Sequence, residues 1–144
     1  MSALRGKHIV VTRPAEQADR LVGQIDARGG IAVRFPVLAI FDVADPGPLE
    51  PAAQDLARYD YAIFVSPNAA QRALGAMSAE RAWPERLVAV AMGETSARII
   101  ARFGVGRILT PQGDRFDSEA LLERPEFAGP AIRGKRVAIF RGEA

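Results

Sequence analysis

Short apolar runs alternate with amphipathic helical stripes along most of the chain. The first run, His8–Thr12, precedes a stripe in which Ala18, Leu21, Val22 and Ile25 fall at i, i+3, i+4 and i+7 spacing. Strands that alternate with helices build a mainly parallel sheet, so the pattern predicts an α/β fold. Further strands are expected over residues 61–65, 88–92, 107–110 and 136–140, with helical stripes over 49–56, 70–77, 94–104 and 119–123.

One long extended stretch interrupts this alternation. Residues Ile31–Val43 contain Pro36 near their middle. Proline cannot donate a backbone hydrogen bond, so we expect an edge strand or a strand that crosses between two lobes. The segment Asp45-Pro46-Gly47-Pro48 follows and is expected to be a turn.

The two ends of the chain carry similar segments. Residues Arg5–Pro14 and Arg133–Gly142 both read as an Arg-Gly-Lys turn, an apolar strand and a polar exit. This internal similarity predicts a protein of two similar α/β units. The chain stops at Ala144, soon after the last strand, so we expect it to be cut short inside the second half.

Composition narrows the function classes. The 144 residues are 49% hydrophobic, with a net charge of +2 and no Lys/Arg cluster, which gives no indication of nucleic acid binding. Cysteine is absent, and the one histidine, His8, lies inside a predicted strand. We therefore expect no metal site. No apolar run approaches ~20 residues, and the N-terminus lacks a signal-like core, so a cytoplasmic protein without a membrane span is expected.

Polar residues gather where the predicted strands end. In open parallel sheets ligands bind beyond these carboxyl ends, where helix N-termini offer free N–H groups to anions. Ordinary roles compete with binding: Ser66, Thr95 and Ser118 are typical helix caps, and the arginines are typical solvated charges. Candidate ligand-binding residues are Arg13, Ser66, Asn68, Gly93, Thr95, Arg141 and Gly142.

Familiar catalytic motifs are missing. The chain has no phosphate-binding loop, no Gly-x-Gly-x-x-Gly sequence and no Gly-x-Ser-x-Gly elbow. The single histidine forms no triad-like arrangement with a serine and an acid. The sequence therefore favours a site that works by positioning and electrostatics, with no catalytic residue assigned.

Six short motifs follow one another along the chain: Thr12-Arg13-Pro14, Phe35–Leu38, Phe64–Ala70, Met92–Ala97, Ser118–Leu122 and Phe140-Arg141-Gly142. This ordered set resembles the uroporphyrinogen-III synthase family. The resemblance implies two mainly parallel, three-layer α/β lobes joined by a two-stranded connector. Residues 1–35 would begin the first lobe, and residues 36–144 would form most of the second, without its last helix and return strand.

The same resemblance implies an activity in tetrapyrrole and heme biosynthesis. Members of the family are hydro-lyases that close the linear tetrapyrrole hydroxymethylbilane to uroporphyrinogen III, inverting ring D through a spiro intermediate. They use no metal or organic cofactor, and a monomer is expected. Carboxylates of the substrate would meet Ser66, Asn68, Gly93 and Thr95 from one lobe and Arg13 from the other, with Arg141-Gly142 beside them.

Two departures and two alternatives accompany this hypothesis. Val65 and Ala70 stand where the family usually has Thr and Val. The missing half leads us to expect that this chain alone is inactive.

One alternative is a non-catalytic ligand-binding or regulatory domain of the same fold. A flavodoxin-like signalling receiver is a second alternative, but its first strand should end in clustered acidic residues, whereas this one ends in Thr12-Arg13-Pro14.

Overall fold

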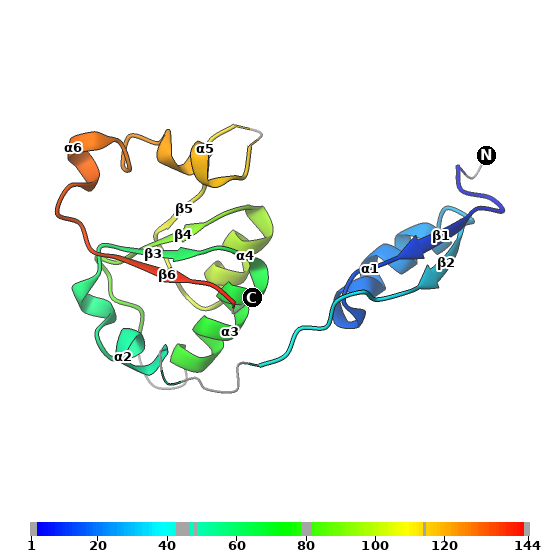
Figure 1. Ribbon diagram of the computed structural model, residues 1–144, viewed down its shortest axis with the longest axis horizontal. Helices are drawn as coiled ribbons and strands as arrows, with labels where there is room; N and C mark the ends of the chain where they lie inside the picture. Colours follow the sequence, from blue (N-terminus) through cyan, green and yellow to red (C-terminus); the bar gives the residue numbers. More distant parts are fainter. Residues whose placement is uncertain (1–2, 43–46, 48, 79–81, 114, 143–144) are drawn as a thin grey trace. The chain divides into compact units, whose positions relative to one another are not determined.

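A computed structural model describes residues 3–42, 47, 49–78, 82–113 and 115–142 (Figure 1). The chain divides into two compact units, Met1–Asp42 and Val43–Ala144. The mainly parallel α/β fold that the sequence predicts is confirmed, since every strand pair in the described residues is parallel. Each unit is described below by itself.

The first unit is one β-α-β element. Strand β1 (His8–Val11) pairs in parallel with β2 (Ile31–Arg34), and helix α1 (Ala15–Asp26) connects them. The helix buries Ala18 and Ile25 against one face of this sheet, as the apolar stripe predicts. The opposite face leaves apolar side chains of both strands exposed, namely Val10, Ile31 and Val33.

The stretch that follows β2 differs from the expected long strand. Regular pairing ends at Arg34, although Phe35 N still donates to Val11 O (2.9 Å) and Val37 N to Thr12 O (3.3 Å). Pro36 lies between these two donors and has no N–H, so the ladder weakens at this point. The expectation of a strand through residue 43 is therefore wrong beyond residue 34. Val43 and most of the turn at 45–48 lie outside the described residues.

A four-stranded parallel sheet organises the second unit. Its strands are β3 (Tyr61–Phe64), β4 (Val88–Ala91), β5 (Ile108–Leu109) and β6 (Val137–Phe140). Their order across the sheet is β5-β4-β3-β6. Thus β6, the last strand in the chain, pairs with β3, and β4 lies on the other side of β3.

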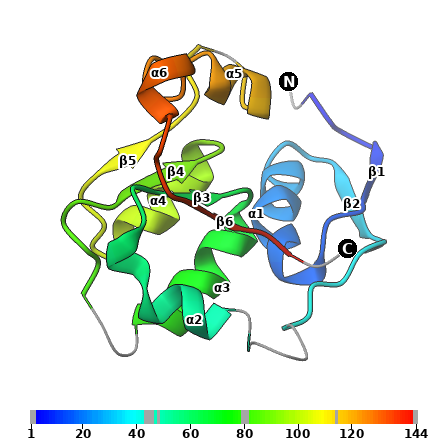
Figure 2. The same cartoon turned by 60° about the vertical axis from the view of Figure 1, so that its left-hand side comes forward.

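Helical segments cover both faces of this sheet, which confirms the predicted three-layer arrangement (Figure 1). On one face lie α2 (Leu49–Gln54), a 3₁₀ turn (Leu56–Arg58), α3 (Pro67–Ser78) and α4 (Glu94–Arg102). The other face carries the shorter helices α5 (Ser118–Leu122) and α6 (Gly129–Ile132), seen again in Figure 2. Helix α6 lies between the helical stripe expected over 119–123 and the strand expected over 136–140, where no element is predicted above.

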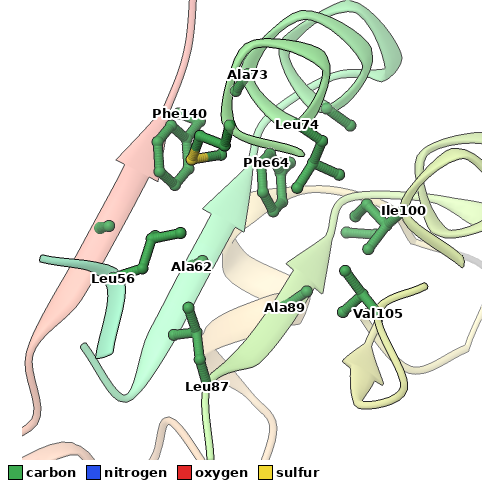
Figure 3. Packing of buried hydrophobic residues seen from close by; sticks show 14 residues of the cluster. Leu56, Ala62, Phe64, Ala73, Leu74, Leu87, Ala89, Ile100, Val105 and Phe140 are labelled. Carbon is green, nitrogen blue, oxygen red and sulfur yellow. The ribbon is translucent and has the colours of Figure 1, made fainter. Parts of the chain in front are cut away.

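The main core lies between the sheet and helices α3 and α4 (Figure 3). Phe64 of the central strand β3 is fully buried and stacks on Phe140, with ring centroids 5.0 Å apart. Trp83 packs 6.3 Å from Phe64, and its indole N–H donates to Leu87 O at 2.9 Å. Trp83 is thus a partly buried residue that packs against this core.

The similar segments at the two ends of the chain form the same local structure. Gly6 and Gly134 both have a positive φ, 72° and 76°. In each segment the next residue donates back to a carbonyl three positions earlier, Lys7 N to Leu4 O and Lys135 N to Ile132 O. Glycine adopts this left-handed conformation without steric cost, so each strand is preceded by the same tight turn.

Asp60 fixes the starts of β3 and β6. Its carboxylate accepts hydrogen bonds from the Arg136 backbone N–H (2.9 Å) and from Lys135 Nζ (2.9 Å). The first of these bonds, and then the second, lowers the pKa of Asp60 below its ordinary value of 3.8. A lowered pKa in the folded state means that the ionised carboxylate stabilises the fold.

Replacing Asp60 with Asn is expected to lower the free energy of unfolding by about 1 kcal/mol at pH 7, a small figure because the side chain is 36% exposed. The loss should shrink as the pH falls below 3.8 through the lowered pKa of the folded state, because wild-type Asp60 is then protonated too. Urea unfolding of both proteins between pH 2 and 7 measures this. Asp55→Asn is the control: Asp55 pairs only locally with Arg58, and its loss should cost about 0.5 kcal/mol or less. An equal effect of both substitutions would contradict the role of Asp60.

Candidate active site

In the second unit, the neighbouring strands β4, β3 and β6 end at the same level of the sheet. Phe64 is in register with Ala91 on one side and with Phe140 on the other. The residues that follow these strands therefore emerge along one edge, in the order Gly93, Ser66, Arg141. The structure thus brings together three of the strand exits that carry candidate residues, because parallel pairing aligns their carboxyl ends. The exit that carries Arg13 belongs to the first unit.

The order in which the chain forms the strands of this sheet reverses at β3. From β3 the chain moves to β4 and β5 through α3 and α4 on one face, whereas it returns to β6 through α5 and α6 on the opposite face. The boundary between β3 and β6 is therefore a topological switch point. Ligands of open parallel sheets bind at such points, beyond the strand ends. The exits of these two strands place Ser66 and Arg141 on either side of this boundary.

Helix α3 begins directly after the exit of β3. Ser66 Oγ accepts a hydrogen bond from Ala69 N at 3.1 Å, and Pro67 is the first helical residue. The predicted helix cap at Ser66 is thus confirmed, and the hydroxyl proton can still be donated outward. Asn68 is half-buried one residue further along, inside the first turn.

Helix α4 begins without any side-chain cap. Gly93 is its N-cap and has an extended backbone (φ 173°, ψ 167°). Thr95 is the second helical residue and is exposed, so the alternative that Thr95 itself caps the helix is wrong. Among the described residues no side chain accepts a hydrogen bond from the first turn, so its N–H groups can bind a carboxylate. Glu94 lies close by, exposed and paired with Arg98 at 3.8 Å.

The exit of β6 is open and basic. Arg141 and Gly142 are both exposed, and Arg141 forms no ion pair with another described residue. A guanidinium in this position can bind a carboxylate through two parallel N–H donors. Together, the three exits combine two helix N-termini, a hydroxyl and one arginine, a set of groups suited to an anionic ligand.

Arg13 follows β1 in the first unit. It is exposed and, within the part of the chain that the structure describes, it forms no ion pair. The residues that follow Arg13 in the sequence line a hollow of about 300 Å³, formed by Ala15, Glu16 and residues 36–39. Its lining is mainly apolar with one acid, which suits a carboxylate ligand poorly.

The segment after β5 contains two features that the sequence analysis misses. Asp117 is the N-cap of α5 and accepts from Ala120 N at 2.8 Å, so the prediction of Ser118 as the cap is wrong. That bond, and then the Arg115 guanidinium, lowers the pKa of Asp117.

Phe116 lies beside the α4 N-terminus, since a Cβ built on Gly93 would be 3.9 Å from its ring. An apolar residue inside a polar loop is the one signal that could have indicated this.

Among the described residues, no group of three or more His, Asp or Glu side chains could hold a metal ion. None of the helices in the described ranges is both long and apolar enough to cross a membrane.

Comparison with known proteins identifies the class to which this fold and site belong. The family described as uroporphyrinogen-III synthase HemD matches residues 19–144. A uroporphyrinogen-III synthase from Synechococcus elongatus is 30% identical over 142 residues, which is 97% of this chain and 52% of that protein. One from Salmonella typhimurium is 31% identical over 135 residues, covering 93% of this chain and 54% of that protein.

The chain belongs to the uroporphyrinogen-III synthase family. It spans about half the length of the curated relatives that it matches. The ordered motifs that the sequence analysis uses therefore identify the family correctly, although each motif alone is short.

Proposed function

We propose that the protein is a uroporphyrinogen-III synthase, acting in tetrapyrrole and heme biosynthesis. Family membership over residues 19–144 is the observation that carries this proposal. The level strand exits support it, because they offer N–H groups, hydroxyls and arginine to a substrate that carries eight carboxylates. The full-length protein is proposed to be a cytoplasmic monomer that binds no nucleic acid.

The reaction needs positioning more than covalent chemistry. The terminal C–O bond of hydroxymethylbilane breaks, the hydroxyl leaves as water after protonation, and an azafulvene remains. The substituted α-carbon of ring D attacks this carbon and forms the spiro intermediate. The bond from that α-carbon to the methylene bridge of ring C then breaks, and the methylene carbon bonds to the other α-carbon of ring D, which loses its proton, so that the ring is inverted. Each step is favoured when the two ends of the bilane are held together, which an anion-binding edge can do through the substrate carboxylates.

The proposed binding roles follow the geometry of each exit. Ser66 and Asn68 at α3, and Gly93 and Thr95 at α4, would hold carboxylates at helix N-termini. Arg141 and Gly142 would bind beside them at β6, and Arg13 would act from the first lobe. No described residue is proposed as a general acid.

The lobe assignment is also a proposal. Residues 1–35 would begin the first lobe of the full-length protein, and residues 36–144 would contribute most of the second. The structure groups residues through Asp42 with the first compact unit. The segment 36–42 would then be part of the connector between the lobes.

A product assay tests the proposed function. Hydroxymethylbilane is supplied to this chain and to a version extended to the length of its relatives, and chromatography separates type I from type III uroporphyrinogen. We expect type III product only from the extended protein, because this chain covers about half of each relative. Type I alone from a folded extended protein would contradict the proposal and favour a non-catalytic ligand-binding domain. Type III from the short chain would contradict its expected inactivity.

A further inference from the structure

Phe116 is a large aromatic residue that the fold leaves in water. Its side chain is 55% exposed, although most aromatic residues of the second unit are at least half-buried. Phe127, on the same connection between β5 and β6, is by contrast buried and packs 4.9 Å from Tyr61. The connection between β5 and β6 can therefore bury an aromatic ring, yet it leaves Phe116 exposed.

The flanking residues restrain Phe116 in this exposed position. Arg115 donates two hydrogen bonds to the Asp117 carboxylate, both 3.1 Å, and a third to Glu123 at 3.3 Å. Asp117 is in turn bound to Ala120 N at the start of α5. Both neighbours of Phe116 are thus hydrogen-bonded to one helix or its cap, which limits the backbone conformations around the ring and lowers the entropic cost of a contact.

The position of the ring relates it to the candidate active site. Its Cδ1 atom lies 3.9 Å from the point where a Gly93 Cβ would be, and Gly93 is the uncapped N-terminus of α4. An apolar surface therefore lies directly beside a carboxylate-binding position. A substituted pyrrole presents the same combination, a flat π-electron ring that carries carboxylate chains.

We propose that Phe116 packs against a pyrrole ring of the tetrapyrrole whose carboxylate is bound at the N-terminus of α4. This inference rests on the proposed function and adds a residue that recognises the ring rather than the charge. Aromatic rings stack offset or edge-to-face, and such a pair changes affinity by roughly two- to tenfold. Phe116 would thereby help to select a pyrrolic ligand over other polycarboxylates.

Calorimetric titration with two probes tests this contact. Uroporphyrin carries four pyrrole rings and eight carboxylates, whereas butane-1,2,3,4-tetracarboxylate has carboxylates and no ring. Phe116→Ala should weaken binding of uroporphyrin roughly fivefold and leave that of the aliphatic probe unchanged. Phe116→Tyr should bind uroporphyrin like the wild type, because it keeps the ring.

Leu122→Ala is the matched control, since Leu122 is 62% exposed on α5 and is another apolar side chain on the same connection. It should leave both affinities unchanged. Wild-type affinity for uroporphyrin in Phe116→Ala would overturn the inference and leave the proposed function standing. Equal weakening of both probes would also overturn it, because the effect would then not concern the ring. Failure of the wild type to bind uroporphyrin would overturn the inference together with its premise.

Discussion

Gly93→Asp is expected to weaken uroporphyrin binding about tenfold or more while the protein remains as stable as the wild type. Gly93 has an extended backbone that any residue can adopt. Among the described residues, a Cβ there would meet only Phe116, at an ordinary 3.9 Å. Aspartate is a favoured N-cap, so it should satisfy the first turn of α4 by itself. The same carboxylate would occupy the N–H groups proposed for the substrate and repel its charge.

Gly93→Asn separates charge from capping. Asparagine caps a helix about as well as aspartate but carries no charge, so it should weaken binding less than aspartate does. Calorimetric titration with uroporphyrin at two salt concentrations measures the affinities, and urea unfolding measures the stabilities. The charge-dependent part of the loss should shrink at higher salt. Equal binding by the wild type and the aspartate variant would show that the α4 N-terminus does not bind the ligand.

Phe64→Ala is expected to lower the free energy of unfolding by about 3–5 kcal/mol, a large part of the stability of a domain of this size. Phe64 is completely buried on the central strand β3, stacked on Phe140 and close to Trp83. Its removal leaves a cavity that strands held on both sides cannot collapse to fill. The sequence contains one tryptophan, Trp83, so its fluorescence during urea unfolding reports on this core.

Ile139→Ala provides the comparison for Phe64. Ile139 is on the neighbouring strand β6, but its side chain is 61% exposed and faces away from this core. Its truncation should cost less than about 1 kcal/mol. Similar losses for the two substitutions would mean that Phe64 does not occupy the packed core described above.

Together with Asp60→Asn, these substitutions distinguish three parts of the molecule. Phe64 concerns core packing, Asp60 concerns the polar link between the starts of β3 and β6, and Gly93 concerns the opposite ends of the strands. Stability should respond to the first two and ligand binding to the third. Such a separation is typical of sites placed on a rigid parallel sheet, where the ligand meets strand exits rather than the core.

Much of the fold follows from local sequence. The spacing of Ala18 and Ile25 predicts the buried face of α1, and Ser66-Pro67 predicts the start of α3. Apolar runs predict all of the strands that the structure describes except the true length of β2. These features depend on side-chain periodicity and capping chemistry, which act between residues a few positions apart.

Long-range structure decided the rest. Sequence periodicity could not show that β6 pairs with β3, and so could not place Arg141 next to Ser66 at a switch point. It also could not show that Asp117, rather than Ser118, caps α5, because both are good caps and only backbone geometry selects one. The position of Phe116 beside Gly93 likewise depends on a contact between residues that are far apart in the sequence.

The sequence by itself therefore determined the α/β class, the family and the polar character of each strand exit. Those properties are carried by short motifs, and a motif keeps its chemistry wherever its strand is placed. The tertiary structure alone decided the strand order, the level alignment of three exits and the aromatic residue beside them. These depend on pairing between segments tens of residues apart, which the packing of the whole sheet selects and no local pattern encodes.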